Sequence, residues 1–493
     1  MIHSDFSRRL ASLPLWQVGL ALLLVCVVTM EWFYAPGGHF HNRLQRELFV
    51  WPLALLLMAG YVLLLNYFPT DRPLTPIEKA VVVVGGILIT TIAAVTVPFH
   101  STDVYGYINR GWQQVAYGTN PYVTVIKALP GWKQDAMLTN HWISNPCPYG
   151  FAFALAAKQL VAWGGGVLSD TLALFKLTNA LVHIGLGLLL AWVASKTQVN
   201  NPTAPWKAFA EWTFHPLLLV HHLANGHNDV WMGALLAGAV ALSLSVQKRD
   251  VWALFAITLS ALMKYATVLV WPLWAVWLVA QRRWMTLLFG VLGSAATVWL
   301  LGLPYWHGML TQAPLNQIVD NATLTHSSVH SLVYYAFRTV AKLMGHEWIT
   351  LAPLVFSLVK VGLMALLGMT VLWSAQRVWK HYRITQESHQ EPLSPTALLT
   401  TVWEPMLTVL CVGVGIVSLK FYPWYVGMVL PSVLMLAQQS LLRRAVMAVA
   451  VVQVLSITIL GQARMADCIV LLLLPLLWVL WSHRCAQNQT ATS

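Results

Sequence analysis

The sequence predicts an all-α fold, a polytopic transmembrane helical bundle that forms one integral-membrane domain over residues 1–493 with no separate soluble domain. Three observations support this prediction. First, 58% of the residues are hydrophobic, only 9% are charged, and the mean hydropathy is +0.65, whereas about 25% of the residues of a soluble domain are charged. Second, apolar runs of about 20 residues, long enough to cross the bilayer as helices, recur from Leu13 to Trp481. Third, the chain has 25 tryptophans, which favour the membrane–water interface.

These runs give about fourteen predicted spans, within a range of about twelve to fourteen. The runs at 207–222, 230–246 and 251–263 are short, and Lys264 interrupts what could be one longer segment. No repeated half is found, which disfavours a transporter built from repeats. In chain order the predicted spans cover residues 13–34, 49–68, 78–97, 172–195, 207–222, 230–246, 251–263, 265–281, 284–303, 351–375, 398–418, 422–440, 445–461 and 467–481.

The positive residues predict the orientation of the bundle. Most of them fall in short loops at alternating ends of the spans, as in the pairs at 248–249, 282–283 and 443–444, and positive residues favour the cytoplasmic side. Both termini are therefore expected in the cytoplasm of a bacterial cell, with the chain in its cytoplasmic membrane. The net charge of +12 then reflects topology and contact with membrane lipids rather than nucleic acid. Two long loops, residues 98–171 and 304–350, are expected to face outward.

The first outer loop has the features of interfacial helices. From Val104 to Val115 it predicts a short helix lying in the interface, and a second such helix is expected after Gly150. Asp103 stands at the start of the first helix. Its local sequence leaves two interpretations open, since Thr-Asp before a helix is a common capping arrangement and a carboxylate at the outer surface can also act as a base.

The sequence resembles the GT-C superfamily of membrane glycosyltransferases, and within it most closely the bacterial polyprenyl-phosphomannose-dependent α-mannosyltransferases. The resemblance covers roughly residues 78–440. Two features depart from the family pattern: the acidic loop follows the third span instead of the first, and Phe151 stands where the family has proline. The motifs on which the resemblance rests are, in chain order, DVYGYINRG at 103–111, GTNPY at 118–122, PYG at 148–150, HPLL at 215–218, NGHND at 225–229, LMKY at 262–265 and KFYPWY at 420–425.

The resemblance implies an inverting glycosyltransferase, which moves a hexose from a polyprenyl-phosphate donor to a lipid or glycan acceptor at the outer face of the membrane. It also implies that this hexose is mannose. It assigns Asp103 as the general base. No metal and no cofactor are expected, since the outer loops contain no Asp-x-Asp or Glu-x-Asp. The candidates for binding the donor phosphate or lipid are Lys264, Lys420, Tyr422, His227 and Arg338.

The two lysines could instead snorkel, lifting their amines from helix ends to the interface. His227 and Asp229 could likewise belong to a polar turn between two spans. The candidates for binding the sugar or acceptor are Tyr105, Tyr107, Arg110, Asn228, Asp229 and His330. A lipid-linked sugar transporter or flippase and a non-catalytic subunit of a glycosylation complex remain alternatives. The first should place its charges near mid-membrane, and the second should lack the base.

Overall fold

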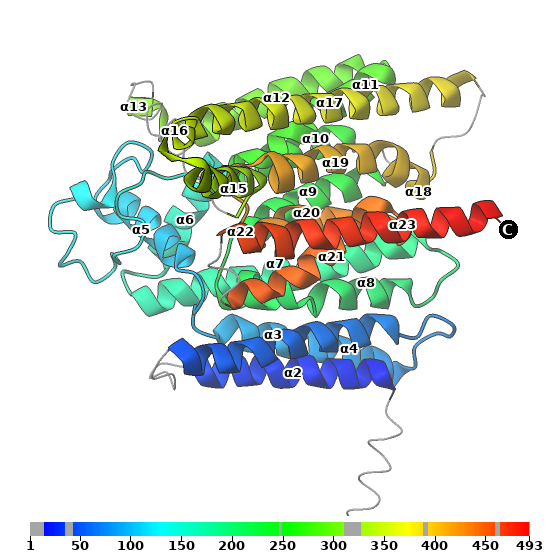
Figure 1. Cartoon of the computed structure of the whole chain (residues 1–493), viewed down its shortest axis with the longest axis horizontal. Coiled ribbons are helices and arrows are strands. Elements are labelled where there is room, and N and C mark those ends of the chain that lie inside the picture. Colours follow the sequence, from blue (N-terminus) through cyan, green and yellow to red (C-terminus); the bar gives the residue numbers. More distant parts are fainter. Residues whose placement is uncertain are drawn as a thin grey trace, which may run out of the picture.

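The computed structural model describes residues 14–34, 43–245, 249–309, 327–387, 393–458 and 464–492, and the chain in these ranges is helical with no β-strand. Most helices lie side by side along one direction (Figure 1). The short helices α5 (Asp103–Ala116) and α6 (Phe151–Trp163) gather at one end of the bundle. The C-terminus and the first turn of α2 (Leu15–Tyr34) lie at the opposite end.

Eight helices in the described ranges are long and apolar enough to cross a membrane. Six are single elements, and two are composite helices with π-helical turns, Pro395–Val417 and Met465–Gln487. The single ones are α2, α3 (Arg43–Asn66), α4 (Pro76–Val95), α7 (Leu168–Thr197), α12 (Trp284–Gly302) and α17 (Ala352–Glu387). The composite ones contain α18 (Pro395–Leu398) with α19 (Glu404–Val412), and α22 (Arg464–Asp467) with α23 (Leu474–Thr492).

Shorter helices fill the interior and the remaining predicted spans. The inner ones, α9 and α10, are apolar but only 15 and 14 residues long, so length alone does not show that they cross the bilayer. The predicted span at 207–222 is two helices, because the first helix ends at Thr213 and the chain is not helical at Phe214 and His215, directly before Pro216. The shorter elements are α8 (Ala204–Thr213), η2 (Leu218–Ala224), α9 (Asp229–Ser243), α10 (Asp250–Met263), η3 (Tyr265–Leu269), α11 (Val270–Ala280), η6 (Pro423–Tyr425), α20 (Val426–Leu434), α21 (Leu441–Val452) and η7 (Gln453–Ile457).

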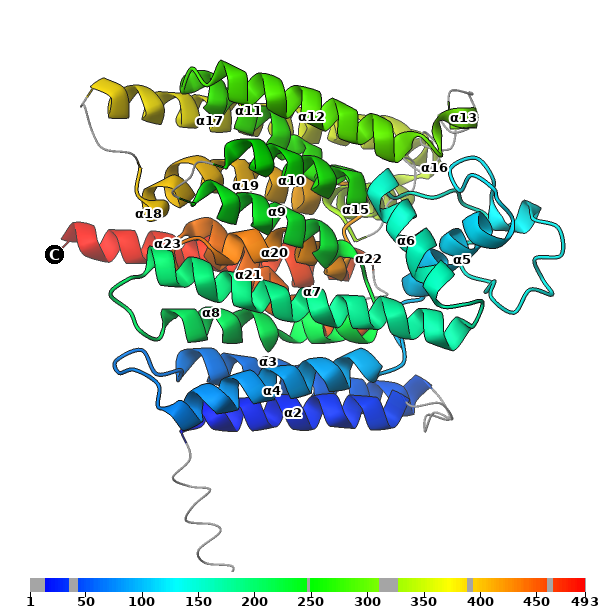
Figure 2. The same ribbon diagram turned by 180° about the vertical axis from the view of Figure 1, so that it is seen from behind.

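A helix therefore occupies each of the fourteen predicted segments, whereas the number that cross the membrane stays a prediction. The helix positions agree because long apolar runs have few other ways to satisfy their backbone in lipid. Helices α5 and α6 occupy the two segments predicted to be interfacial and pack against each other, whereas their position at the membrane interface stays a prediction. Seen from behind, both cap the same end of the bundle (Figure 2).

The second long loop contains a helix that the sequence analysis did not predict. Helix α15 (Val329–Met344) begins after Ser328, whose hydroxyl accepts a hydrogen bond from the amide of Ser331. It contacts α17 and lies at the same end of the bundle as α5. Residues 310–326 of this loop are outside the described ranges. The two loops that the sequence predicts to face outward thus share one end.

Candidate functional site

The segment that leads into α5 is held by one side chain from a distant part of the sequence. The Oδ1 atom of Asn225 accepts hydrogen bonds from the amides of Phe99, His100 and Ser101, at 3.0, 2.7 and 3.1 Å. The Asn225 amide group donates in turn to the carbonyl of Val220 at 2.8 Å. Because three consecutive amides share one acceptor, the backbone before α5 has little freedom at the point where Asp103 follows.

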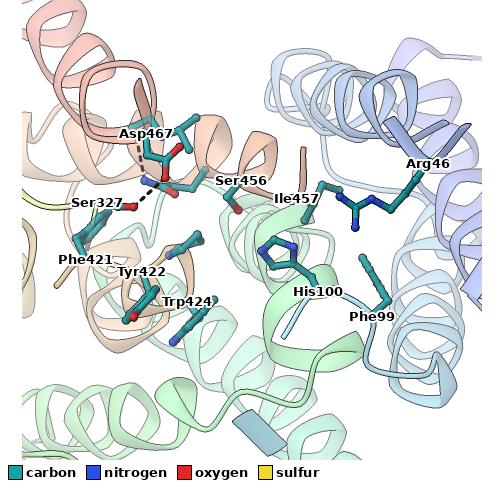
Figure 3. Close-up of a pocket in the computed structure, with 13 residues that line it drawn as sticks. Arg46, Phe99, His100, Ser327, Phe421, Tyr422, Trp424, Ser456, Ile457 and Asp467 are labelled. Atoms are coloured by element: carbon teal, nitrogen blue, oxygen red, sulfur yellow. Dashed lines mark hydrogen bonds between the residues drawn. The ribbon is translucent and has the colours of Figure 1, made fainter. Parts of the chain in front are cut away.

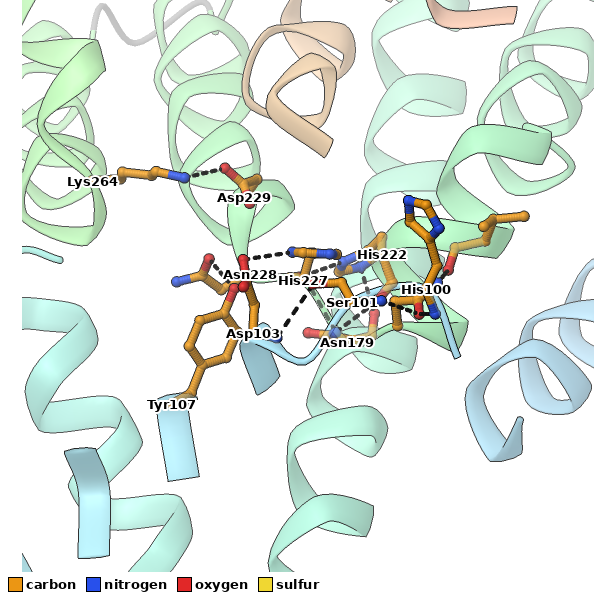
Figure 4. A network of polar contacts seen from close by, with 12 residues as sticks. His100, Ser101, Asp103, Tyr107, Asn179, His222, His227, Asn228, Asp229 and Lys264 are labelled. Carbon is orange, nitrogen blue, oxygen red and sulfur yellow. Dashed lines mark hydrogen bonds and ion pairs between the residues drawn. The ribbon is translucent and has the colours of Figure 1, made fainter. Parts of the chain in front are cut away.

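Asp103 lies in the first turn of α5, and it is not the cap of that helix. The N-cap is Thr102, whose side chain makes no capping hydrogen bond, and the Asp103 amide donates to the Ser101 hydroxyl at 3.3 Å. The Asp103 carboxylate instead approaches His227, with Oδ2 3.5 Å from Nδ1 (Figure 4). The capping interpretation of Asp103 is therefore wrong, because the side chain points toward another part of the chain.

The surroundings of Asp103 suit a proton acceptor. Its side chain is 13% exposed, and burial raises the pKa of Asp103 from 3.8 to about 6. The Lys264 ammonium opposes this rise, and the Asp229 carboxylate reinforces it. A carboxyl with a pKa just below neutrality is mostly ionised at neutral pH, yet it binds a proton more strongly than an exposed aspartate.

His227 is buried and fixed by an aromatic stack. Its ring lies 3.9 Å from the ring of Trp424 at an interplanar angle of 17°, and Trp424 stacks in turn on Tyr422 at 4.7 Å and 3°. Burial holds the pKa of His227 well below its ordinary value, so the imidazole is neutral. The backbone carbonyl of His227 is also within 3.0 Å of the His222 Nδ1 atom.

Lys264 and Asp229 form an ion pair beside this cluster. Lys264 Nζ lies 2.6 Å from Asp229 Oδ1 and 4.2 Å from the centre of the Tyr425 ring. The lysine is in extended conformation where α10 ends and η3 begins. Figure 4 shows its amine directed at Asp229. Snorkelling therefore does not describe Lys264, because its ammonium is paired with a buried carboxylate.

The turn that bears Lys264 is packed tightly against the start of α6. The amide of Gly150 donates to the carbonyl of Met263 at 3.1 Å, and a Cβ atom on Gly150 would lie 2.1 Å from the carbonyl oxygen of Leu262. Only glycine permits this approach. Phe151, the departure from the family motif, starts α6 and stacks on Tyr305 at 5.6 Å.

Two more predicted residues of α5 have defined partners. The Tyr107 hydroxyl donates to Asn228 Oδ1 at 3.1 Å, which ties α5 to the loop that contains His227. Arg110 is buried and donates to the carbonyls of Trp142 and Asn145 at 3.0 and 2.6 Å. Arg110 thus holds the loop between α5 and α6. Because its guanidinium donates to backbone carbonyls of that loop, it is not placed to bind a sugar or a phosphate.

The structure does not bring the other predicted residues into this cluster by any hydrogen bond or ion pair among the described residues. Tyr105 packs near His141. Lys420 is half-buried, and burial lowers its pKa. On α15, His330 Nε2 is 3.0 Å from the carbonyl of Val417, and the Arg338 guanidinium lies over the ring of Tyr334. Their assignments stay predictions.

Two residues that build the site were not predicted from the sequence. Asn225 and Trp424 both lie in motifs that carry the family resemblance, and that position was the available signal. Local sequence does not predict that Asn225 contacts residues 99–101 or that Trp424 stacks on His227. Among the described residues no group of three or more His, Cys, Asp or Glu side chains could hold a metal ion, and the absence of a metal in the reaction stays a prediction.

The chain is similar to known mannosyltransferases. A family model described as alpha-(1->6)-mannopyranosyltransferase, N-terminal domain, matches residues 18–281. Alpha-(1->6)-mannopyranosyltransferase A of Mycobacterium tuberculosis is 31% identical over 174 residues, which are 34% of this chain and 31% of the relative. The protein of the same name in Corynebacterium glutamicum is 23% identical over 175 residues, 36% of this chain and 34% of the relative.

The aligned part thus spans about a third of the length of these curated relatives. No solved structure matches the chain. The range matched by the family model contains Asp103, His227, Asp229 and Lys264, so the cluster around Asp103 lies within the shared part.

Proposed function

Because this chain belongs to the alpha-(1->6)-mannopyranosyltransferase family, we propose that it transfers a mannosyl group from a polyprenyl-phosphate donor to a hydroxyl of a lipid or glycan acceptor. The observation that carries the proposal is the buried Asp103 carboxylate, which faces His227 at 3.5 Å. An acceptor alcohol attacks more readily when a positioned carboxylate takes its proton.

The chemistry is a single displacement. The Asp103 carboxylate takes the proton of the acceptor hydroxyl while that oxygen forms a bond to the anomeric carbon. The bond from this carbon to the phosphate oxygen breaks, and its electron pair leaves with the lipid phosphate. One displacement inverts the configuration, so a β-linked donor gives an α-linked product. The proton then passes from Asp103 to water.

Lys264 is the cation best placed for the leaving phosphate. Its ammonium pairs with Asp229, and Asp103 faces His227 two residues earlier in the same loop, so both groups adjoin residues 227–229. One of its three N–H donors points to Asp229 at 2.6 Å, which leaves others for a phosphate oxygen. In a site of low dielectric constant, such a cation stabilises the developing charge more than it would in water.

His227 is better explained as a positioning residue than as a ligand of the donor phosphate. The imidazole is 1% exposed, lies on Trp424 and contacts the carboxylate. A neutral imidazole can donate one hydrogen bond to the ionised base and fix its rotamer. This is the pattern in which a second side chain orients the group that moves the proton.

The location of the charges favours an enzyme over a transporter. Asp103, His227 and the pair of Asp229 with Lys264 gather at the end of the bundle that carries α5 and α6. A translocation path would need ionisable groups along its length. The proposed orientation places this end at the outer face of the cytoplasmic membrane, where a flipped lipid-linked sugar is available.

A transfer assay with purified protein tests the proposal. The substrates are a synthetic short-chain β-mannosyl phosphopolyprenol and octyl α-mannopyranoside, with a nucleotide-linked mannose as the alternative donor. We expect transfer from the lipid-linked donor alone and an α-linkage in the product by NMR. A β-linked product would contradict single displacement, and transfer from the nucleotide sugar would contradict the proposed donor.

A further inference from the structure

A polar pocket separate from the ion pair of Lys264 lies between the N-terminal helices and the C-terminal part of the chain. It has a volume of about 270 Å³, near the lower end of the range for small-ligand sites, which starts at ~300 Å³. Arg46 of α3 and His100 lie on one side of it, and Tyr422, Trp424 and Asp467 on the other (Figure 3). A site of this size fits one sugar ring better than an oligosaccharide.

The lining combines hydrogen-bonding groups from several segments. The buried Asp467 carboxylate accepts from the Ser327 hydroxyl at 2.8 Å. The Gln453 amide donates to the carbonyl of Leu471 at 3.1 Å, and the Ser456 hydroxyl lies 3.1 Å from His221 Nε2. These contacts fix a carboxylate, a carboxamide and a hydroxyl in the pocket wall, the groups that recognise sugar hydroxyls.

The charge of the lining disfavours a phosphate. Arg46 brings a cation to the pocket, but its guanidinium lies 3.1 Å from the Glu47 carboxylate, and the Asp467 carboxylate would repel an anion. His100 is neutral, since burial lowers its pKa to about 4. The stacked rings of Tyr422 and Trp424 add an apolar wall, which suits the C–H groups of a sugar ring. A neutral polyhydroxylated ligand matches this lining best.

The pocket shares its walls with the proposed catalytic site. His100 lines the pocket and precedes Asp103 by three residues, in the segment that Asn225 holds. Trp424 lines the pocket as well and stacks on His227, the partner of Asp103. A sugar bound here therefore contacts the segment that leads into Asp103 and the ring that stacks on His227, the partner of Asp103.

We propose that this polar pocket binds one neutral hexopyranosyl ring, the terminal sugar of the acceptor. The inference rests on the proposed function, in that the acceptor hydroxyl must reach Asp103. It adds residues of α3, η7 and α22 to the substrate site.

The test measures binding of two probes to the purified chain in a detergent without a sugar headgroup. The probes are octyl α-mannopyranoside and a short-chain polyprenyl phosphate that carries no sugar. Asp467→Asn keeps an oxygen that can accept from Ser327, and Ser456→Ala is a second, milder change. Asp170→Asn at the exposed start of α7 is the charge-matched control. Melting temperatures show that each variant is folded.

We expect Asp467→Asn to raise the Kd of octyl α-mannopyranoside about tenfold, as for the loss of a hydrogen bond to a charged group. Ser456→Ala should raise it less, and the polyprenyl phosphate should bind all variants alike. Unchanged binding of the mannoside in both variants would overturn the proposal. So would a changed Kd of the polyprenyl phosphate in either variant, tighter in Asp467→Asn because a repelling charge is removed, since the pocket would then hold the phosphate.

The transfer assay separates acceptor from donor. In Asp467→Asn the KM of the mannoside should rise while the KM of the donor stays unchanged, and a rise in the donor KM alone would refute the acceptor assignment. If the wild-type chain transfers no mannose yet binds the mannoside in a way that Asp467→Asn weakens, the proposed function fails and the sugar pocket stands.

Discussion

Replacing Asp103 by asparagine removes a charge and a proton acceptor while preserving the size of the side chain. If Asp103 is the general base, kcat should fall by about 10²-fold to 10⁴-fold. Donor binding should persist, because Lys264 and its partner Asp229 are untouched. The measurement is mannosyl transfer by the purified variant, with donor binding followed separately.

The same substitution should change stability with pH. Burial raises the pKa of Asp103 from 3.8 to about 6, so the folded chain binds this proton more tightly than the unfolded chain. The stabilisation is fully present below pH 3.8 and is lost as the pH rises through about 6. A shift of about two pKa units corresponds to ~3 kcal/mol. Because the side chain keeps 13% of its exposure, this value is an upper limit.

The asparagine variant is neutral at every pH, so above pH 6 it should be more stable than the wild type by up to ~3 kcal/mol. Below pH 4 the two should agree. Thermal unfolding in detergent at pH 4 and pH 8 measures the difference, and Asp170→Asn, on the exposed start of α7, should show none. Full activity with no gain in stability at pH 8 would refute both the buried carboxylate and its catalytic role.

Four further results are expected. The value of kcat/KM should fall as the pH drops through about 6, because the proposed base of the free protein becomes protonated, and a pH profile of kcat/KM measures this. Lys264→Met should raise the donor KM and destabilise the fold by about 3 kcal/mol, since Asp229 is left buried without its partner. Adding Asp229→Asn to that variant should restore the stability but not the use of the donor. Asn225→Leu should lower kcat and destabilise the fold by more than ~2 kcal/mol, because three amides lose their acceptor, as unfolding and transfer assays would show. In a cysteine-free chain, an impermeant thiol reagent applied to intact cells should label Gln134→Cys and spare Asn200→Cys, and the reverse would place the site in the cytoplasm.

The helices were predictable because their signal is local. A long apolar run specifies a helix whatever its neighbours are, and each predicted segment contains one. The signal for α15 is weaker, since that helix lies in a polar loop and is amphipathic rather than uniformly apolar. The break at Pro216 was also encoded locally, but a short apolar run on both sides of it made the segment look continuous.

The site was predictable only in part, because its contacts join distant residues. The motif around Asp103 pointed to a base, and the lysine after Met263 pointed to a cation. That Lys264 pairs with a carboxylate 35 residues away has no signature in either motif. The same holds for Asn225, whose partners lie more than a hundred residues earlier.

One short loop organises the whole cluster. The four polar side chains of residues 225–229 hold, in chain order, the segment before α5, the Asp103 carboxylate, the Tyr107 hydroxyl and the Lys264 ammonium. The glycine within this loop has a φ of +74°, a conformation that lets the four side chains diverge toward different elements.

The proposed base, Asp103, and the proposed cation, Lys264, are therefore positioned by the same five residues. Their separation is therefore set when the chain folds rather than when a substrate binds. A site whose charges are already oriented does not have to reorganise as the phosphate leaves, which is the main way in which fixed charges lower a barrier. The buried ion pair and the raised pKa of Asp103 are destabilising in isolation, and the proposed catalytic use of Asp103 and Lys264 accounts for charges that the fold alone does not need.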